Sequence, residues 1–429
     1  MPFDTSTRPT VAIIGGGISG MAAAWRLKDS HRVTLYEAEP RLGGHARTVL
    51  AGKNGDQPVD TGFIVFNRVN YPHLCGLFAE LDVPVADSDM SFGASFGGGR
   101  FEYGLKDIRA VFAQRRNAVD PRFLRMIRDI LRFNKHALRM ADRDESLGAF
   151  LDRMGTGEWF RDRYILPLSG AIWSTPAQGI LDFPAAALVR FFDNHALLHH
   201  AGQHKWLTVQ GGSVAYVRRL EAALRRAGVE IRTGAPVASV RRPAFGAEVA
   251  LQGAEPHTVD SVIFATHSDV SLRILADPSE AERSALSAVR YQPNRAILHS
   301  DTSVMPKRRA VWSSWNYTAP NGTSPDKIDL TYWMNSLQPI PLDDPLFVTL
   351  NPDRPIDRAL IHDEVDFAHP VYDAAAEEGR VAIRALNGMR DTWFCGAWMR
   401  DGFHEDGFAS AVDATDALIA RRRDALAAE

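Results

Sequence analysis

The chain has 429 residues, of which 45% are hydrophobic, 24% charged and 9% aromatic. This is the composition of a globular protein, and the length predicts two domains rather than one hydrophobic core. The net charge of −3 gives no reason to expect a nucleic-acid partner. Cys75 and Cys395, the only cysteines, exclude a disulfide framework and a four-thiolate zinc site, so no metal ligands are predicted.

The hydrophobic pattern argues against insertion into a membrane. No stretch reaches the roughly 18 uninterrupted apolar residues that span a bilayer. Residues 1–10 are short and polar and lead directly into the first expected strand, which leaves no room for a cleavable signal. We therefore expect a soluble, cytoplasmic protein.

The first elements expected along the chain are a strand, a glycine turn and a helix. An apolar run over residues 10–14 is followed by Gly15, Gly17 and Gly20, with Ile18 and Ser19 at the helix start. The first glycine permits a tight turn, the second lets backbone approach a pyrophosphate, and the third lets helix and strand pack closely. The N-terminus of the helix then offers N–H groups and a partial positive charge to phosphates. The pattern predicts a dinucleotide site.

The next expected strand, residues 32–36, ends in an acidic residue. Glu37, followed by Ala38, stands close to the spacing expected for an acceptor of ribose hydroxyl protons. A carboxylate there disfavours the 2′-phosphate of NADP. Arg41 then precedes Gly43 and Gly44, and a simple NAD domain has no need of this motif. A guanidinium and backbone N–H groups on one diphosphate suit FAD, whose second half continues to an isoalloxazine ring.

These motifs resemble those of the flavin-containing amine oxidase superfamily, which also includes carotenoid desaturases, protoporphyrinogen oxidases and polyunsaturated fatty acid isomerases. The resemblance continues in residues 60–63 and in the C-terminal segments 393–398 and 402–411. It implies noncovalent FAD, because Cys395 precedes Gly396 in an apparent strand and is typical of a small buried residue. Many relatives carry arginine where this chain has His45. The implied cofactor contacts are Gly15, Gly17, Ile18, Ser19, Gly20, Glu37, Ala38, Arg41, Gly43, Gly44, His45, Thr61, Gly62, Phe63, Val237, Thr266, Gly396, Asp406, Gly407 and Phe408.

The resemblance also implies an α/β fold in which a Rossmann-type FAD-binding domain is interleaved with an α+β substrate-binding domain. We expect the FAD-binding domain in residues 1–95, 205–285 and 380–429. The substrate-binding domain then comprises residues 96–204 and 286–379. Trp173, Tyr332 and Trp333 are candidate walls of a substrate pocket.

The catalytic residues suggested by the sequence follow the last glycine-rich segment. If Asp406 and Gly407 are aligned with the acid–glycine pair of the family, His404 falls where amine oxidases commonly have an aromatic residue. A histidine there can act as a base, and Glu405 is a second proton acceptor. Residues 291–300 contain Arg295 but no lysine, although amine oxidases often supply one from the matching strand. Both departures disfavour amine oxidation.

The chain is also similar to bacterial flavoproteins that modify unsaturated and cyclopropane-type fatty acids, including a desaturase of furan fatty acid synthesis. The segments that carry this resemblance are residues 41–46, 62–67, 171–176 and 402–408. It implies an FAD-dependent oxidoreductase that abstracts a hydride from an unsaturated or methylated acyl chain of a phospholipid and adds a double bond. The alternatives are a flavin-dependent amine oxidase, a redox-neutral double-bond isomerase and an FAD-bound scaffold or sensor without turnover.

One expected helix, residues 121–140, has opposed apolar and cationic faces. Its apolar residues are Phe123, Ile127, Ile130, Leu131 and Leu138. The ten basic and three acidic residues of segment 106–140 give it a net charge of +7. Such a segment suits the surface of an anionic membrane, here its inner face, and the alternative is a solvated face of a core helix.

Overall fold

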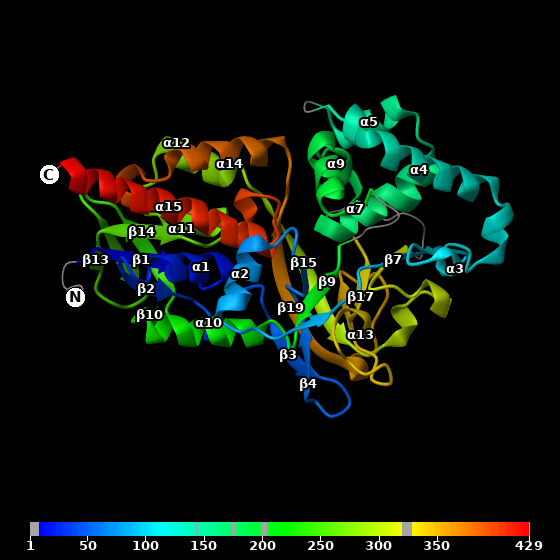
Figure 1. The fold of residues 1–429 in the computed structure, drawn as a ribbon, viewed down its shortest axis with the longest axis horizontal. Coiled ribbons are helices and arrows are strands. Elements are labelled where there is room, and N and C mark those ends of the chain that lie inside the picture. Colours follow the sequence, from blue (N-terminus) through cyan, green and yellow to red (C-terminus); the bar gives the residue numbers. More distant parts are fainter. Residues whose placement is uncertain (1–7, 143–144, 174–176, 199–203, 320–327, 429) are drawn as a thin grey trace.

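A five-stranded parallel sheet forms one end of the molecule (Figure 1). The computed structural model describes residues 8–142, 145–173, 177–198, 204–319 and 328–428. In order of pairing, the strands of the sheet are β10 (Glu230–Arg232), β2 (Arg32–Tyr36), β1 (Thr10–Ile14), β14 (Ser261–Phe264) and β20 (Thr392–Phe394). This is the Rossmann-type sheet that the sequence predicts.

Helices and a small sheet cover the two faces of the parallel sheet. Val11 and Ile13 of β1 pack among helices α1 (Ile18–Leu27), α10 (Val214–Arg226) and α15 (His404–Ala428). Ala12 and Ile14 face the opposite way. They pack toward the sheet of β11 (Val237–Arg241), β12 (Ala247–Leu251) and β13 (His257–Val259) and toward α11 (Ser268–Ile274), α12 (Glu280–Ser287) and α14 (Ala374–Leu386). Burial on both faces explains why β1 is a continuous apolar run.

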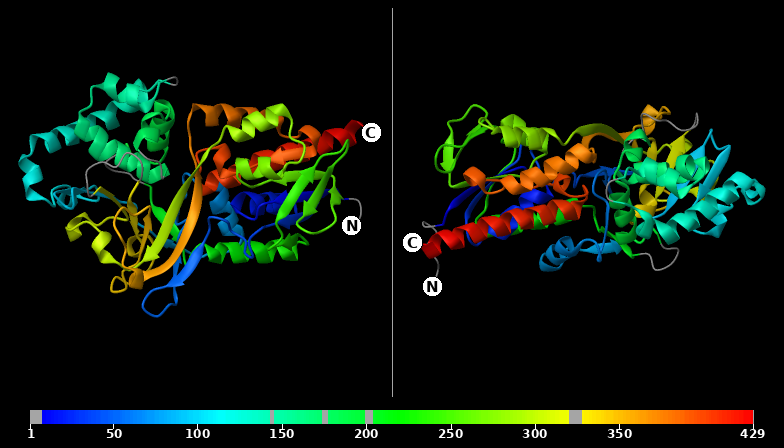
Figure 2. Two further views of the ribbon diagram at one scale, coloured as in Figure 1. Left: turned by 180° about the vertical axis from the view of Figure 1, so that it is seen from behind. Right: turned by 90° about the horizontal axis from the view of Figure 1, so that it is seen from above.

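A seven-stranded sheet forms the middle of the molecule. Its strands in order are β19 (Ile361–Pro370), β15 (Tyr291–His299), β18 (Phe347–Leu350), β17 (Leu330–Trp333), β16 (Trp315–Ala319), β7 (Phe92–Phe96) and β8 (Phe101–Gly104). The long pair β15 and β19 forms the edge of this sheet on the side of the parallel sheet (Figures 1 and 2). We expected residues 1–95 in the FAD-binding domain. The last residues of that segment belong to β7, which is a strand of the seven-stranded sheet.

A helical group lies at the far end from both termini (Figure 2). Its aromatic and aliphatic side chains form one core with the seven-stranded sheet. The helices are α3 (Ile108–Val111), α4 (Pro121–Met140), α5 (Leu147–Met154), α6 (Glu158–Phe160), α7 (Leu166–Trp173), α8 (Ala177–Leu181) and α9 (Ala185–Asn194). The expected helix over residues 121–140 is confirmed with the same bounds.

Short elements join the two ends of the molecule. A two-stranded sheet pairs β3 (Thr48–Ala51) with β4 (Gln57–Asp60), and α2 (Pro72–Glu80) packs against α15. A three-stranded sheet contains β5 (Val65–Asn67), β9 (Trp206–Val209) and β6 (Val85–Asp87). The short helix α13 (Met334–Leu337) follows β17.

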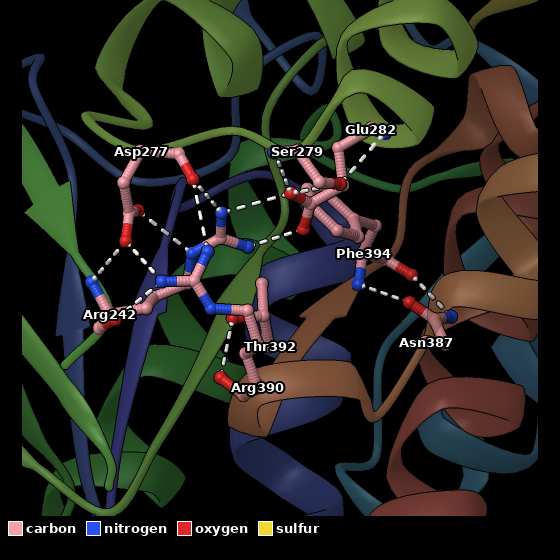
Figure 3. A network of polar contacts seen from close by, with 8 residues as sticks. All are labelled: Arg242, Asp277, Ser279, Glu282, Asn387, Arg390, Thr392 and Phe394. Carbon is pink, nitrogen blue, oxygen red and sulfur yellow. Dashed lines mark hydrogen bonds and ion pairs between the residues drawn. The ribbon is translucent and has the colours of Figure 1, made fainter. Parts of the chain in front are cut away.

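A buried arginine ties together three distant segments of the half that carries the parallel sheet (Figure 3). The guanidinium of Arg242, beyond β11, donates to Asp277 at 3.1 Å and to Glu282 of α12. Arg390, just before β20, also pairs with Asp277. The Arg242 side chain is fully buried, so its charge depends on these carboxylates for stabilisation.

Candidate functional site

The glycine turn between β1 and α1 is held by close backbone packing. Gly15 has φ of +110°, and its N–H donates to the Tyr36 carbonyl at 2.8 Å. A Cβ on Gly20 would overlap the carbonyl oxygen of Gly15. A Cβ on Gly17, in contrast, would meet nothing within 4 Å. The first and third glycines therefore serve the fold, and the second leaves open space at the helix N-terminus where a phosphate fits.

The carboxylate of Glu37 braces this turn at the end of β2. Its Oε2 accepts a hydrogen bond from the Gly16 N–H at 2.6 Å, and its Oε1 accepts one from the Glu39 N–H at 2.8 Å. Ala38, next to it, is exposed. The acid predicted to bind ribose thus lies at the mouth of the glycine turn and also fixes its backbone.

The double glycine lies directly beside the turn. The Gly43 N–H donates to the Gly16 carbonyl at 2.9 Å, and a Cβ on Gly44 would lie 3.3 Å from the Cα of Gly17. Arg41 donates to the carbonyl of Gly44 at 3.1 Å and pairs with Glu39 at 3.1 Å. The glycine turn and the double glycine therefore form one cradle of backbone. The Arg41 guanidinium lies at the edge of this cradle, where it is bonded to the Gly44 carbonyl and to Glu39.

The segment after β4 continues the cradle. The Thr61 N–H donates to the Arg47 carbonyl and the Phe63 N–H to the His45 carbonyl, at 2.9 and 2.8 Å. A Cβ on Gly62 would overlap the carbonyl oxygen of His45. The sequence predicts backbone close to the flavin ring here, and the structure places this backbone against the residue that follows the double glycine.

Val237 is expected near the adenine and Thr266 at the sheet edge that faces the cofactor, and the two residues lie on separate elements. Val237 begins β11, pairs with Leu251 and is partly exposed. Thr266 follows β14, and its hydroxyl is 2.8 Å from that of Ser271. The carbonyl of Thr266 accepts a hydrogen bond from the Trp398 indole at 3.1 Å.

The C-terminal helix returns to the glycine turn. A Cβ on Gly407 would lie 2.8 Å from Cγ2 of Ile18 and 2.9 Å from Oγ of Ser19, so α15 packs closely on α1. Gly396 donates its N–H to Ser410 at 2.9 Å, and Phe408 is buried. The structure thus joins the two predicted ends of the site.

Asp406 sits in the first turn of α15. Its carboxylate accepts a hydrogen bond from the Phe403 N–H at 2.9 Å. Burial, assisted by the charge of Asp401, raises the pKa of Asp406 to about 7. This acid is therefore poised to change charge near neutral pH.

His404 packs at the start of α15. Its ring stacks on Phe63 with centroids 3.9 Å apart and planes 11° apart, and its Nε2 lies 2.5 Å from the hydroxyl of Tyr216. Burial lowers the pKa of His404 to about 3, so the ring is neutral at physiological pH. The sequence predicts a base at this position, and the structure shows that one of its two nitrogens already has a partner.

Glu405 has a different role from the proton acceptor that the sequence suggests. Its two carboxylate oxygens accept the backbone N–H groups of His73 and Leu74 at 2.8 and 3.0 Å. These N–H groups begin α2, so Glu405 caps that helix. Successive residues of a helix point about 100° apart, which turns Glu405 away from the side that His404 faces.

Sequence reasoning missed a cluster of histidines beside the double glycine. The ring of His45 lies 6.0 Å from that of His267 and 5.7 Å from that of His369, between centroids. His45 also stacks on Phe367 at 4.9 Å. A signal was present, because His267 closely follows β14 and His369 lies near the end of β19, but the sequence does not show that these ends meet.

Four histidines near the double glycine and the start of α15 are partly buried. His45, His267, His369 and His404 each keep part of their surface accessible. Burial nevertheless lowers the pKa of His45 to about 3 and that of His369 to about 4, and it also lowers the pKa of His267. Burial therefore keeps the rings of His45, His369 and His404 neutral at physiological pH.

Aromatic residues extend from the residue before α15 toward the helical group. Phe403 stacks on Phe191 of α9 with centroids 4.9 Å apart, and Phe191 lies 4.8 Å from Trp173 of α7. Phe183 and Tyr372 continue the cluster. We call these five residues the aromatic wall.

The other two predicted pocket aromatics lie on a strand of the seven-stranded sheet, and Tyr332 packs against the same hydrophobic cluster as the aromatic wall. Tyr332 and Trp333 belong to β17 and contact Trp315 and Trp312 in the seven-stranded sheet. The structure therefore brings Trp173, but not this pair, into the aromatic wall.

The described residues contain neither a metal-binding cluster nor a membrane-spanning helix. No group of three or more histidine, cysteine, aspartate or glutamate residues is arranged to hold a metal ion. No helix in that part of the chain has the length and apolar character needed to cross a membrane.

The arrangement fits FAD. The open space at Gly17, the adjoining backbone of Gly44 and the N-termini of α1 and α15 suit a diphosphate. The histidine cluster lies next to the double glycine, on the side where the ring end of FAD would continue. The thiol of Cys395 is buried, and burial raises its pKa to about 12, so it is not a reactive thiolate.

Comparison with known proteins agrees with this geometry. The family model described as flavin containing amine oxidoreductase matches residues 18–335. The FAD-dependent oxidoreductase dbaF of Emericella nidulans is 44% identical over 91 residues, which are 21% of this chain and 18% of that protein. Curated relatives are thus matched over less than a fifth of their length.

Solved structures show the same fold over nearly the whole chain. The CLA-producing fatty acid isomerase from P. acnes has a TM-score of 0.69 and 15% identity, over 98% of this chain and 99% of that one. Cyclohexylamine oxidase from Brevibacterium oxydans IH-35A has a TM-score of 0.69 and 13% identity, over 97% and 100%. With the family match over most of its length, the chain belongs to the flavin containing amine oxidoreductase family, and its cofactor is FAD.

Proposed function

We propose that this flavoprotein is an FAD-dependent oxidoreductase that removes a hydride and a proton from an unsaturated or methylated fatty acyl chain of a phospholipid, forming an additional double bond. The observation that carries this proposal is the aromatic wall, which adjoins the start of α15. Its members Trp173, Phe183 and Phe191 are uncharged, nearly fully buried and packed on one another, and an apolar group of this kind suits an acyl chain.

The histidine cluster supplies a place for the proton. When bound, FAD supplies a two-electron acceptor for the hydride. Dioxygen or another oxidant then returns the reduced cofactor to its oxidised form. The proton leaves the carbon next to the one that lost the hydride, and the two carbons gain the double bond. The Nε2 of His45 is buried and has no hydrogen-bond partner in the described part of the chain. We assign the proton to this atom because it lies beside the double glycine and has no other partner among the described residues.

The neighbouring residues then have positioning roles. His369 is fixed through its Nδ1, which lies 2.9 Å from the side-chain amide of Asn294. His404 is fixed by its stacking on Phe63 and by Tyr216. We do not propose Glu405 as the proton acceptor, because its carboxylate caps α2.

The same features argue against amines as substrates. The ring end of the site is bordered by neutral imidazoles, and β15 carries no lysine. Its one cationic residue, Arg295, is exposed and pairs with Glu364. The solved fatty acid isomerase and cyclohexylamine oxidase share only the fold with this chain, so reaction specificity has to be tested directly.

The test is anaerobic mixing of the FAD-loaded protein with a phospholipid that carries a methyl-branched, monounsaturated chain. We expect the flavin absorption to bleach and mass spectrometry to find a diene that has lost two hydrogens. Bleaching by a diamine, but not by the lipid, would replace the proposal with amine oxidation. A rearranged lipid of unchanged mass without bleaching would replace it with isomerisation. No reaction with any of these compounds would favour a protein that binds FAD without turnover.

A further inference from the structure

Helix α4 exposes a line of leucines that its packing does not use. Leu124, Leu131 and Leu138 are 44%, 49% and 51% exposed. Their spacing of seven residues places them on one side of the helix. The face that packs into the core carries other residues, namely Phe123, Met126, Phe133 and Ala137. The sequence predicts a single apolar face that includes Leu131 and Leu138, whereas α4 has two apolar stripes, one packed and one exposed.

Cations border this line of leucines. By helical geometry, Arg128, Arg132, Lys135 and Arg139 follow it around the exposed surface of α4. Within the described residues, no ion pair joins Arg132, Lys135 or Arg139 to a carboxylate. Arg122 and Arg125, in contrast, pair with Asp120 and Asp129. The free charges therefore lie on the leucine side.

Further apolar residues and the overall charge distribution agree. Ile108 and Val119, in the segment leading to α4, are 70% and 80% exposed. Segment 106–140 carries a net charge of +7 in a chain whose net charge is −3, so positive charge is concentrated here. In Figures 1 and 2, α4 lies at the end of the molecule opposite the parallel sheet, where it is accessible to a flat surface.

We propose that this α4 surface, formed by Leu124, Leu131, Leu138, Arg132, Lys135 and Arg139, docks on an anionic phospholipid bilayer. A bilayer has an apolar layer beneath a layer of phosphates. The α4 surface matches it, because its leucines and its cations form two separate, adjacent rows. The leucines enter the boundary of the acyl layer while the cations contact the headgroups. The inference is independent of the proposed reaction, since it concerns binding alone.

The experiment is flotation of the FAD-loaded protein with vesicles of saturated-chain phosphatidylglycerol, and with neutral phosphatidylcholine vesicles for comparison. Saturated chains carry no allylic position, so turnover does not affect the result. We expect the parent protein to float with the anionic vesicles. The triple substitution Leu124→Ser, Leu131→Ser, Leu138→Ser and the double substitution Arg132→Glu, Arg139→Glu each reduce binding more than about tenfold.

The matched control is Arg218→Glu, Arg226→Glu, which reverses two exposed arginines of α10 and leaves binding unchanged. Retained flavin absorption reports that each variant is folded, and the double arginine variant decides the outcome if the leucine variant loses its flavin. Equal binding by parent and variants, or no flotation of the parent, overturns the proposal. A parent dimer that the leucine variant dissociates, detected by sedimentation velocity, overturns it in favour of a self-interface.

Discussion

The centroids of the His45 and His369 imidazole rings lie 5.7 Å apart, and within the described residues a side-chain hydrogen bond anchors His369, whereas the Nε2 of His45 has no partner. His369 contacts the Asn294 amide through Nδ1, and Asn294 in turn accepts a hydrogen bond from Asn351 at 2.7 Å. The Nε2 of His45 is buried without such a partner. The pair thus combines a fixed ring with a ring that is free to take a proton, and this difference separates the expected effects of replacing each.

Replacing His45 with Gln is expected to slow flavin reduction by lipid about 10²- to 10⁴-fold, the usual contribution of a positioned base. The measurement is anaerobic stopped-flow absorption at saturating lipid, with FAD occupancy checked by the protein-to-flavin absorption ratio. His369→Gln is the comparison and is expected to have the smaller effect. Because burial lowers the pKa of His45 to about 3, the parent rate does not fall between pH 8 and 5 through protonation of this ring. A rate that follows a group titrating near 6.5 would contradict the assignment.

Gly17→Ala is expected to weaken FAD binding without unfolding the protein. Gly17 has φ of −72°, which alanine adopts readily, and an added Cβ meets no protein atom within 4 Å. The methyl group instead fills the space that we assign to a phosphate. We expect an increase in the FAD dissociation constant of at least about tenfold, or about 1.4 kcal/mol.

The matched control for this experiment is Gly76→Ala in α2, where an added Cβ also meets nothing. Titration of the apoprotein with FAD, followed by flavin fluorescence, measures both variants, and thermal unfolding of the apoproteins shows that the fold is intact. Unchanged FAD affinity of Gly17→Ala would show that the phosphates lie elsewhere.

The predictability of the site from the sequence follows from how far apart its parts are. The glycine turn and the double glycine are local signals, because the residues that shape the backbone are consecutive. The histidine cluster is not local. It forms only when residue 45, the loop after β14 and the end of β19 come together in the tertiary structure. The spacing of the histidines along the sequence does not predict that contact.

Helix α4 shows a second limit of the same kind. Its apolar residues repeat with helical periodicity on two stripes, one ending in Phe133 and Ala137 and the other in Leu131 and Leu138. Periodicity identifies the helix correctly. Which stripe is packed depends on the position of α9 and the seven-stranded sheet, which only the tertiary structure reveals.

Removing the charge of Arg242 is expected to destabilise the half of the protein that contains the parallel sheet. Arg242→Met leaves Glu282 buried without its cation, and breaking a buried pair in this way costs about 3 to 5 kcal/mol. The measurement is the free energy of unfolding by urea, with FAD at saturation. Arg241→Met, which alters an exposed neighbour, is the control and is expected to change stability by less than about 0.5 kcal/mol. Equal stability of the two variants would show that the network in Figure 3 contributes little.

Asp406→Asn is expected to make the protein more stable than the parent at high pH. The pKa of Asp406 is raised from 3.8 to about 7 in the folded protein. Between these values the unfolded chain loses the proton while the folded protein keeps it, so the parent loses stability as pH rises through this window. Each pKa unit corresponds to about 1.4 kcal/mol, which sets an upper limit of about 4 kcal/mol. Asparagine keeps an acceptor for the Phe403 N–H and does not titrate.

The free energy of unfolding of the variant minus that of the parent should therefore grow from pH 4 to 7 and then level off, as measured by urea denaturation at fixed ionic strength. Asp56→Asn, an exposed site, should show no such trend, and a flat difference for Asp406→Asn would mean that this carboxylate is charged in the folded protein across the whole range.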